Sequence, residues 1–90
     1  MAEIHFELGR ALARLGWEAE ALGEFAEAVR LKPDLPDAHL NYGVALARTR
    51  RYSEAVTEFR ETLRLNPQDQ GAQRMLDQAT RSAQTKGANH

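Results

Sequence analysis

The sequence predicts an all-α protein of five helices, arranged as two helix–turn–helix units in tandem and one helix after them. The main observation is a repetition: the stretch from Gly9 to Pro33 returns as Gly43 to Pro67, with a constant offset in numbering (43 − 9 = 67 − 33). Within each copy the apolar residues recur at helical spacing. A proline ends each copy, where it stops a helix because its nitrogen has no hydrogen to donate. A fixed period of about 20–50 residues is typical of proteins whose units stack on one another.

The apolar spacing, together with residues that start or stop helices, places the five elements. Gly16 is expected to close the first helix, since glycine is favoured just past a helix end. Pro36 presets the first turn of the third helix, and Ser53 with the residues after it resembles a cap and first turn of the fourth. The helices are expected at about residues 2–15, 18–32, 36–48, from 52 or 53 to 65, and 70–84.

The chain is expected to form one domain over residues 1–84. The first unit covers about residues 2–35 and the second about residues 36–69. The last helix, at about 70–84, stands in the frame of a third unit without a partner helix. A helix that is apolar on one side and polar on the other closes the exposed end of such an array. Residues 85–90 have nothing to pack against and are predicted to be a disordered tail.

The composition restricts the classes of function. The chain has 90 residues, of which 42% are hydrophobic and 28% charged, and this fits one small soluble domain. The absence of cysteine excludes disulfides and thiolate chemistry. With a formal net charge of −1, nothing favours nucleic acid or an anionic membrane as a partner. We expect no membrane span and no signal peptide. The compartment is left open, with the cytoplasm favoured.

No residue pattern favours catalysis, a cofactor or a metal. His5 and His39 occupy the same place in the two units. We interpret them as packing residues, because zinc needs three or four converging ligands and no cysteine or carboxylate is evidently placed beside them. No glycine-rich phosphate loop is present. We interpret Arg48, Arg50 and Arg51 as part of a solvated turn, because no aromatic residues that could stack on bases alternate with them.

The repeated unit carries a recognisable pattern. The first copy reads His5-x-x-Leu8-Gly9-x-x-Leu12, then Ala21-x-x-x-Phe25-x-x-Ala28, then Pro33, and the second reads His39-x-x-Tyr42-Gly43-x-x-Leu46, then Ala55-x-x-x-Phe59, then Pro67. This pattern resembles the tetratricopeptide repeat, a helix–turn–helix unit. The resemblance covers residues 2–69. It departs from the family pattern at the histidines, which stand in place of tryptophan, and Thr62 stands where the first copy has Ala28.

The resemblance implies an αα superhelix whose concave face is lined by the first helix of each unit. Extended or helical peptides usually bind on that face in this family, so the implied function is a protein–protein interaction module without catalysis. Four apolar residues are expected to lie exposed in the groove, because the stacking of the helices does not need them: Phe6, Leu40, Val44 and Met75. The full set expected in the groove is Phe6, Arg10, Arg14, Leu40, Asn41, Val44, Arg48, Arg74, Met75 and Gln78.

Two alternative functions remain open at this stage. The module can be a self-associating scaffold, because its first helix has no preceding unit to cover Ile4 and Phe6. It can also be the accessory repeat array of a larger enzyme. The subgroup of the family that binds chaperone tails through a two-carboxylate clamp is not favoured, since only Asn41 matches that clamp.

Overall fold

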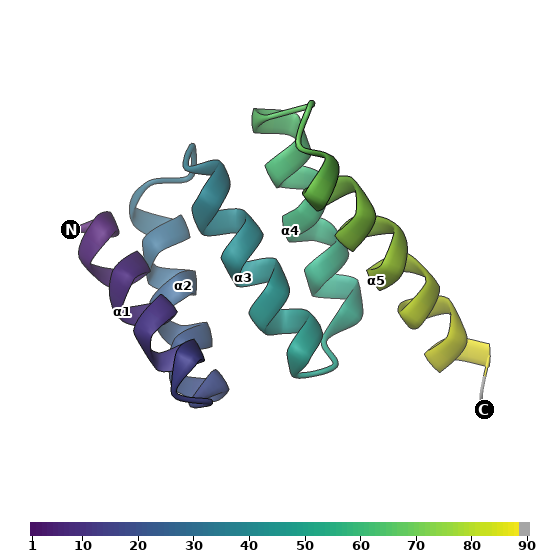
Figure 1. The fold of residues 1–90 in the computed structure, drawn as a ribbon, viewed down its shortest axis with the longest axis horizontal. Coiled ribbons are helices and arrows are strands. Elements are labelled where there is room, and N and C mark those ends of the chain that lie inside the picture. The colour runs from purple at the N-terminus through teal and green to yellow at the C-terminus, as the bar shows by residue number, and fades with distance from the viewer. Residues whose placement is uncertain (89–90) are drawn as a thin grey trace.

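The computed structural model describes the backbone of residues 1–88 and the side chains of residues 1–85. The five helices are α1 (Ala2–Arg14), α2 (Glu18–Leu31), α3 (Pro36–Arg48), α4 (Tyr52–Leu65) and α5 (Gln70–Ala88). The prediction of an all-α array of five helices is confirmed (Figure 1). Within the described part of the chain, no helix combines the length and the apolar character needed to cross a membrane.

The helices follow one another across the molecule in the order of the sequence (Figure 1). Each helix packs on the next, and the contacts between helices far apart in the chain are few. The array therefore has two end faces, one on α1 and the other on α5. An array of this kind gains its stability from the interfaces between neighbouring helices rather than from one central core.

A close contact between a glycine and a phenylalanine fixes the crossing of the two helices in each unit. A Cβ atom added to Gly9 would lie 2.7 Å from Cε1 of Phe25, and one added to Gly43 would lie 2.6 Å from Cε1 of Phe59. Both phenylalanine rings are buried. Because carbon atoms in contact normally stay about 3.5–4.0 Å apart, no residue with a side chain fits at either glycine without moving the ring.

The core consists of two adjoining clusters. One contains Ala21, Phe25 and Ala45, and the other contains Leu46 and Phe59 with two alanines. The half-buried side chains of Leu22 and Tyr42 pack against both clusters and join them.

The second unit also buries one hydroxyl. Thr62, which replaces the Ala28 of the first unit, donates a hydrogen bond to the carbonyl oxygen of Glu58 at 2.9 Å. Its hydroxyl is therefore satisfied inside the core, and the departure from the pattern carries little cost.

Two local predictions were wrong. Helix α4 begins at Tyr52, so Ser53 lies inside the first turn and does not cap the helix. Helix α5 continues to Ala88, past the end expected at residue 84. No proline follows residue 84, and a single glycine weakens a helix by only about 1 kcal/mol, so nothing stops the helix there. The last two residues of the predicted tail, 89 and 90, lie outside the described residues.

The turn inside each unit has the same hydrogen bonds but a different residue at its strained position. Gly16 and Arg50 occupy the same place in the two units, and both have positive φ, at 83° and 65° respectively. In each turn the next residue donates a backbone hydrogen bond to a leucine carbonyl, at 2.9 Å in the first and 2.8 Å in the second. Gly16 closes α1 as predicted. Arg50 adopts a left-handed conformation that costs a residue with a Cβ about 1–2 kcal/mol.

We predict that Gly43→Ala lowers the free energy of unfolding by about 1–3 kcal/mol, because the new methyl group overlaps the buried ring of Phe59. Thermal or urea unfolding followed by circular dichroism measures the change. The matched control is Gly23→Ala, since no atom lies within 4 Å of a Cβ built at Gly23. That variant should be more stable than the parent by about 0.5–1 kcal/mol. Equal effects of the two substitutions would contradict the close crossing.

We also predict that Arg50→Gly raises the free energy of unfolding by about 0.5–1 kcal/mol. Relief of the left-handed strain outweighs the greater chain entropy that glycine brings to the unfolded state. The reverse exchange in the first unit, Gly16→Ala, should destabilise by about 1–2 kcal/mol. Both values come from urea unfolding, and a loss of stability in Arg50→Gly would show that the turn is not strained.

Candidate functional site

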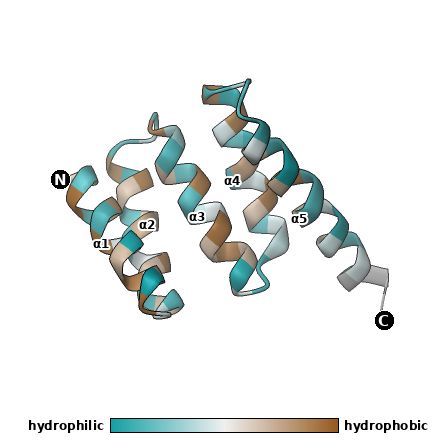
Figure 2. Ribbon diagram, in the orientation of Figure 1, coloured by the Kyte–Doolittle hydropathy of each residue, from teal (hydrophilic) through white to brown (hydrophobic). Residues whose placement is uncertain are grey.

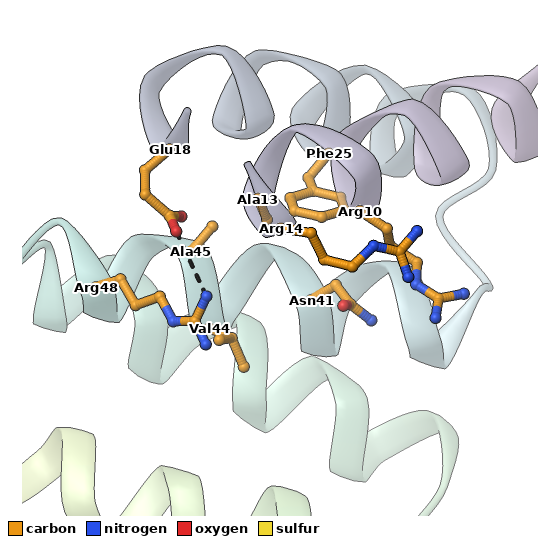
Figure 3. A pocket seen from close by; sticks show the side chains of 9 residues that line it. All are labelled: Arg10, Ala13, Arg14, Glu18, Phe25, Asn41, Val44, Ala45 and Arg48. Atoms are coloured by element: carbon orange, nitrogen blue, oxygen red, sulfur yellow. Dashed lines mark hydrogen bonds and ion pairs between the residues drawn. The ribbon is translucent and has the colours of Figure 1, made fainter. Parts of the chain in front are cut away.

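Two adjoining hollows lie along the array. The first, of about 220 Å³, lies between the first unit and α3. It is lined by Arg10, Ala13, Arg14, Glu18, Phe25, Asn41, Val44, Ala45 and Arg48 (Figure 3). The second, of about 370 Å³, lies between the second unit and α5. It is lined by Val44, Ala47, Arg48, Tyr52, Phe59, Met75, Gln78, Ala79 and Ser82.

The two hollows are equivalent under the sequence repeat. Every residue of the first hollow has its counterpart one repeat later in the second, from Arg10 and Val44 to Arg48 and Ser82. Val44 and Arg48 belong to both hollows because α3 stands between them. The hollows therefore form one continuous groove with a repeated backbone, and we call them the first and second hollows of the groove.

The first hollow is rich in positive charge. Figure 3 shows the guanidinium groups of Arg10 and Arg14 together at one side, and Arg48 at the other side turned toward Glu18. Nη1 of Arg48 lies 3.4 Å from Oε1 of Glu18. Among the described residues Arg14 has no ion-pair partner. The lining of this hollow holds three arginines against one carboxylate, and Nη1 of Arg10 also lies 3.6 Å from Oε1 of Glu7, which does not line the hollow.

Several polar groups of the first hollow are only partly satisfied. Oε2 of Glu18 is buried, and among the described residues it has no hydrogen-bond partner. The side-chain amide of Asn41 donates to the carbonyl oxygen of Asp37 at 2.8 Å, which leaves its other N–H and its oxygen open to a ligand. The hollow thus holds donors that fit a carboxylate and a resident carboxylate that competes for them.

The second hollow is more apolar at the equivalent positions. Tyr52 stands where the first hollow has Glu18, Met75 where it has Asn41, and Ser82 where it has Arg48. Met75 is one of the large hydrophobic residues that remain exposed. The second hollow can therefore take an apolar side chain, with Arg48 at the border to the first.

Seven of the ten residues predicted for the groove line the hollows: Arg10, Arg14, Asn41, Val44, Arg48, Met75 and Gln78. The other three, Phe6, Leu40 and Arg74, line neither hollow. These three occupy the same position in successive repeats, and none of them lines the groove. One repeat position, wrongly assigned to the groove, accounts for all three.

Phe6 and Leu40 pack into the core, contrary to the prediction that they are not needed for stacking. The ring of Phe6 lies 6.2 Å from that of Phe25, centroid to centroid, and Arg10 stacks over Phe6 at 5.6 Å. Leu40 packs against the cluster around Leu46, and so does Val44, although Val44 also lines the groove. Of the four residues in the predicted apolar strip, Met75 alone is among the exposed large hydrophobics of the described chain.

The second helix of each unit also contributes to the groove, which was not predicted from the sequence. Glu18 and Tyr52 are the first residues of α2 and α4, and both face the groove. Phe25 and Phe59 form part of the floor. One signal in the sequence points to Glu18 and Tyr52. They hold the same repeat position, directly after the turn that joins the two helices of a unit.

Away from the groove, each histidine of the repeat forms a hydrogen bond with a glutamate. The prediction that no carboxylate lies beside the histidines was therefore wrong. Nδ1 of His5 lies 2.7 Å from Oε1 of Glu24, and Nδ1 of His39 lies 2.7 Å from Oε1 of Glu58. Both pairs join the first helix of a unit to the second. In the described part of the chain, these pairs included, no three histidine, aspartate or glutamate side chains gather as metal ligands do.

The pair in the second unit is the more buried of the two. The side chain of His39 is 6% exposed, against 33% for His5. Nε2 of His39 also lies 2.7 Å from the carbonyl oxygen of Pro33. Since a carbonyl only accepts, this nitrogen donates, and both ring nitrogens of His39 are engaged. Burial, helped by the Glu58 carboxylate, raises the pKa of the nearby Tyr42 hydroxyl.

The arginines of the turn before α4 do not contribute to the groove. The guanidinium of Arg51 donates two hydrogen bonds to the carboxylate of Glu54, at 2.9 and 2.8 Å. These hydrogen bonds lower the pKa of Glu54. Arg50 is exposed. This agrees with a solvated turn.

Comparison with known proteins identifies the repeat. The sequence model of the family described as tetratricopeptide repeat matches residues 6–70. No curated protein sequence matches the chain. Among solved structures, that of the MamA R50E mutant superposes with a TM-score of 0.86 at 20% sequence identity. This match covers 91% of the present chain and 60% of that chain, and at such low identity it shows the fold alone.

The histidine–glutamate pairs yield a prediction about stability. Glu58→Ala should lower the free energy of unfolding by about 1–3 kcal/mol, because it leaves a nearly buried histidine nitrogen without its partner. Glu24→Ala, the matched change in the first unit, should cost only about 0–1 kcal/mol, because water reaches His5. Urea unfolding at neutral pH measures both, and a larger loss in Glu24→Ala would contradict the difference in burial.

Proposed function

The chain belongs to the tetratricopeptide repeat family, and we propose that it binds a segment of a partner protein along the groove and carries out no catalysis. Repeats of this family generally mediate interactions between proteins. The observation that carries the proposal is the pair of equivalent hollows that share Val44 and Arg48. A groove with a repeated backbone suits a polypeptide ligand, whose own side chains also recur at regular spacing.

The two hollows favour different side chains of the ligand. Arg10, Arg14 and Asn41 in the first hollow offer donors that suit a carboxylate, since guanidinium and carboxylate groups can form paired hydrogen bonds. Tyr52 and Met75 in the second hollow offer apolar surface. The proposed ligand is therefore a segment with an acidic residue near an apolar one.

The residues around the groove support binding rather than catalysis. Among its described lining residues Glu18 is the one carboxylate, and it lies beside Arg48. Ser82 is the one hydroxyl nucleophile besides Tyr52, and no histidine lines either hollow within the described chain. A serine without a base is a poor nucleophile. The groove thus has the groups for recognition and lacks a pair for nucleophilic chemistry.

A displayed peptide library, in which short segments vary freely, tests the proposal directly. Selection against the wild-type chain should enrich segments that combine an acidic and an apolar residue. Calorimetric titration of one selected peptide against variants then locates the site. Selection that yields no binding peptide, or peptides whose affinity does not change in any groove variant, would overturn the proposal.

We predict that Arg48→Ala weakens binding of such a peptide by about 1–3 kcal/mol, as loss of a charge-assisted hydrogen bond does. The stability of this variant should barely change, because the side chain of Arg48 is exposed and its ion pair with Glu18 contributes little. Conversely, Glu18→Gln should strengthen binding, since it removes the resident carboxylate that competes for Arg48.

The double variant Arg50→Ala, Arg51→Ala is the matched control, since it removes two arginines close to Arg48 in the sequence but outside the groove. It should alter mainly the association rate and its salt dependence, as peripheral charges do. Loss of binding in this control, with Arg48→Ala unaffected, would place the ligand on the turn instead of in the groove.

A further inference from the structure

The outer side of α1 is an apolar surface that nothing covers within the described chain. Ile4, Leu8 and Leu15 are exposed by 63%, 45% and 63%. Their equivalents on α3 include Ala38, which is buried, and Tyr42, which is half-buried against α2. The same side of the first helix is thus covered in the second unit and open in the first.

These residues form a regular seam. Met1, Ile4, Leu8, Ala11 and Leu15 follow each other at spacings of three and four residues, the alternation of positions a and d in a two-helix coiled coil. At 3.6 residues per turn they occupy one side of α1 and of the residues that flank it, Met1 and Leu15. Phe6 lies on the opposite side of the helix and packs against the cluster around Phe25, and Leu12, at the edge of the seam, packs against the same cluster. The seam is therefore separate from the core side of the helix.

The two ends of the array differ in polarity. The side of α5 that faces away from α4 carries exposed polar residues, namely Gln70, Arg74, Asp77, Arg81 and Gln84. In Figure 2 most of α5 is teal to pale, whereas brown residues recur along α1. A second copy stacked head to tail would cover the apolar seam with a polar surface. Two copies that meet seam to seam cover apolar surface on both sides.

We propose that two copies of this chain pair through α1 in an antiparallel, two-fold symmetric contact. Antiparallel pairing places Ile4 opposite Leu15 of the second copy and Leu8 opposite the small Ala11, so that large and small side chains alternate. The contact is isologous, with the same residues on both copies, and therefore closes as a dimer.

The charges beside the seam fit this arrangement. Glu7 and Arg14 both occupy the g position, next to the a residues Leu8 and Leu15. In an antiparallel pair, g positions of the two helices face each other, and Glu7 of each copy meets Arg14 of the other. Symmetry gives two such attractive pairs. Within its own chain Glu7 lies 3.6 Å from Arg10 with both side chains well exposed, so it is free to turn toward a second copy.

Sedimentation equilibrium of the whole chain tests the dimer. The average mass should rise with concentration from 10.1 kDa toward twice that value. Leu8→Glu should raise the dimer dissociation constant at least about tenfold, because the symmetric contact loses two buried leucines. Gln70→Glu adds the same charge to the polar side of α5 and should leave the constant unchanged. Circular dichroism checks that both variants remain helical.

A charge exchange tests the antiparallel register and does not depend on the leucine. Glu7→Arg should weaken the dimer by placing two arginines opposite each other, and the double change Glu7→Arg, Arg14→Glu should restore it. A mass of 10.1 kDa at every concentration would overturn the proposal and leave the seam for a preceding repeat of a longer chain. A dimer weakened by Gln70→Glu but not by Leu8→Glu, or one that the double exchange does not restore, would overturn it as well.

Discussion

The contact between glycine and phenylalanine inside each unit is the constraint on which the rest of the structure depends. Gly9 and Gly43 bring the backbone of the first helix against the rings of Phe25 and Phe59. Those rings fill the core, and they also form part of the floor of the two hollows. The packing that stabilises a unit therefore shapes the surface that a ligand meets. A methyl group at either glycine would disturb both at once.

On this repeated backbone the two units differ in the chemistry they present. Core positions keep nearly the same residue in both copies, because each is fixed by close packing. The groove positions are less restricted, since they face open space. Glu18 and Asn41 in the first hollow become Tyr52 and Met75 in the second. One backbone thus yields a charged hollow beside an apolar one, and any selectivity for a ligand arises from positions that the fold does not need.

The fold could be predicted well from the sequence, because the residues that determine it recur at a fixed period. The number and order of the helices and the closing Gly16 follow from the repeat spacing and from residue types with few structural uses, whereas the end of α5 does not. The parts that were not predicted depend on side-chain rotation and on pairs between helices. Phe6, expected in the groove, packs against Phe25 instead. The bond between His39 and Glu58 joins residues 19 apart, which no single-helix period suggests, although the same spacing recurs in the first unit.

Helix α1 carries three separate sides, and one residue lies on the border of two. Its core side packs on α2, its groove side supplies Arg10 and Arg14, and its outer side carries the seam. Arg14 lines the first hollow and also flanks the seam. A guanidinium that pairs with Glu7 of a second copy offers fewer hydrogen bonds to a ligand carboxylate. Because such coupling is reciprocal, a ligand that engages Arg14 weakens the dimer by the same factor by which the dimer weakens the ligand. The proposed groove and the proposed seam are thus linked through one arginine.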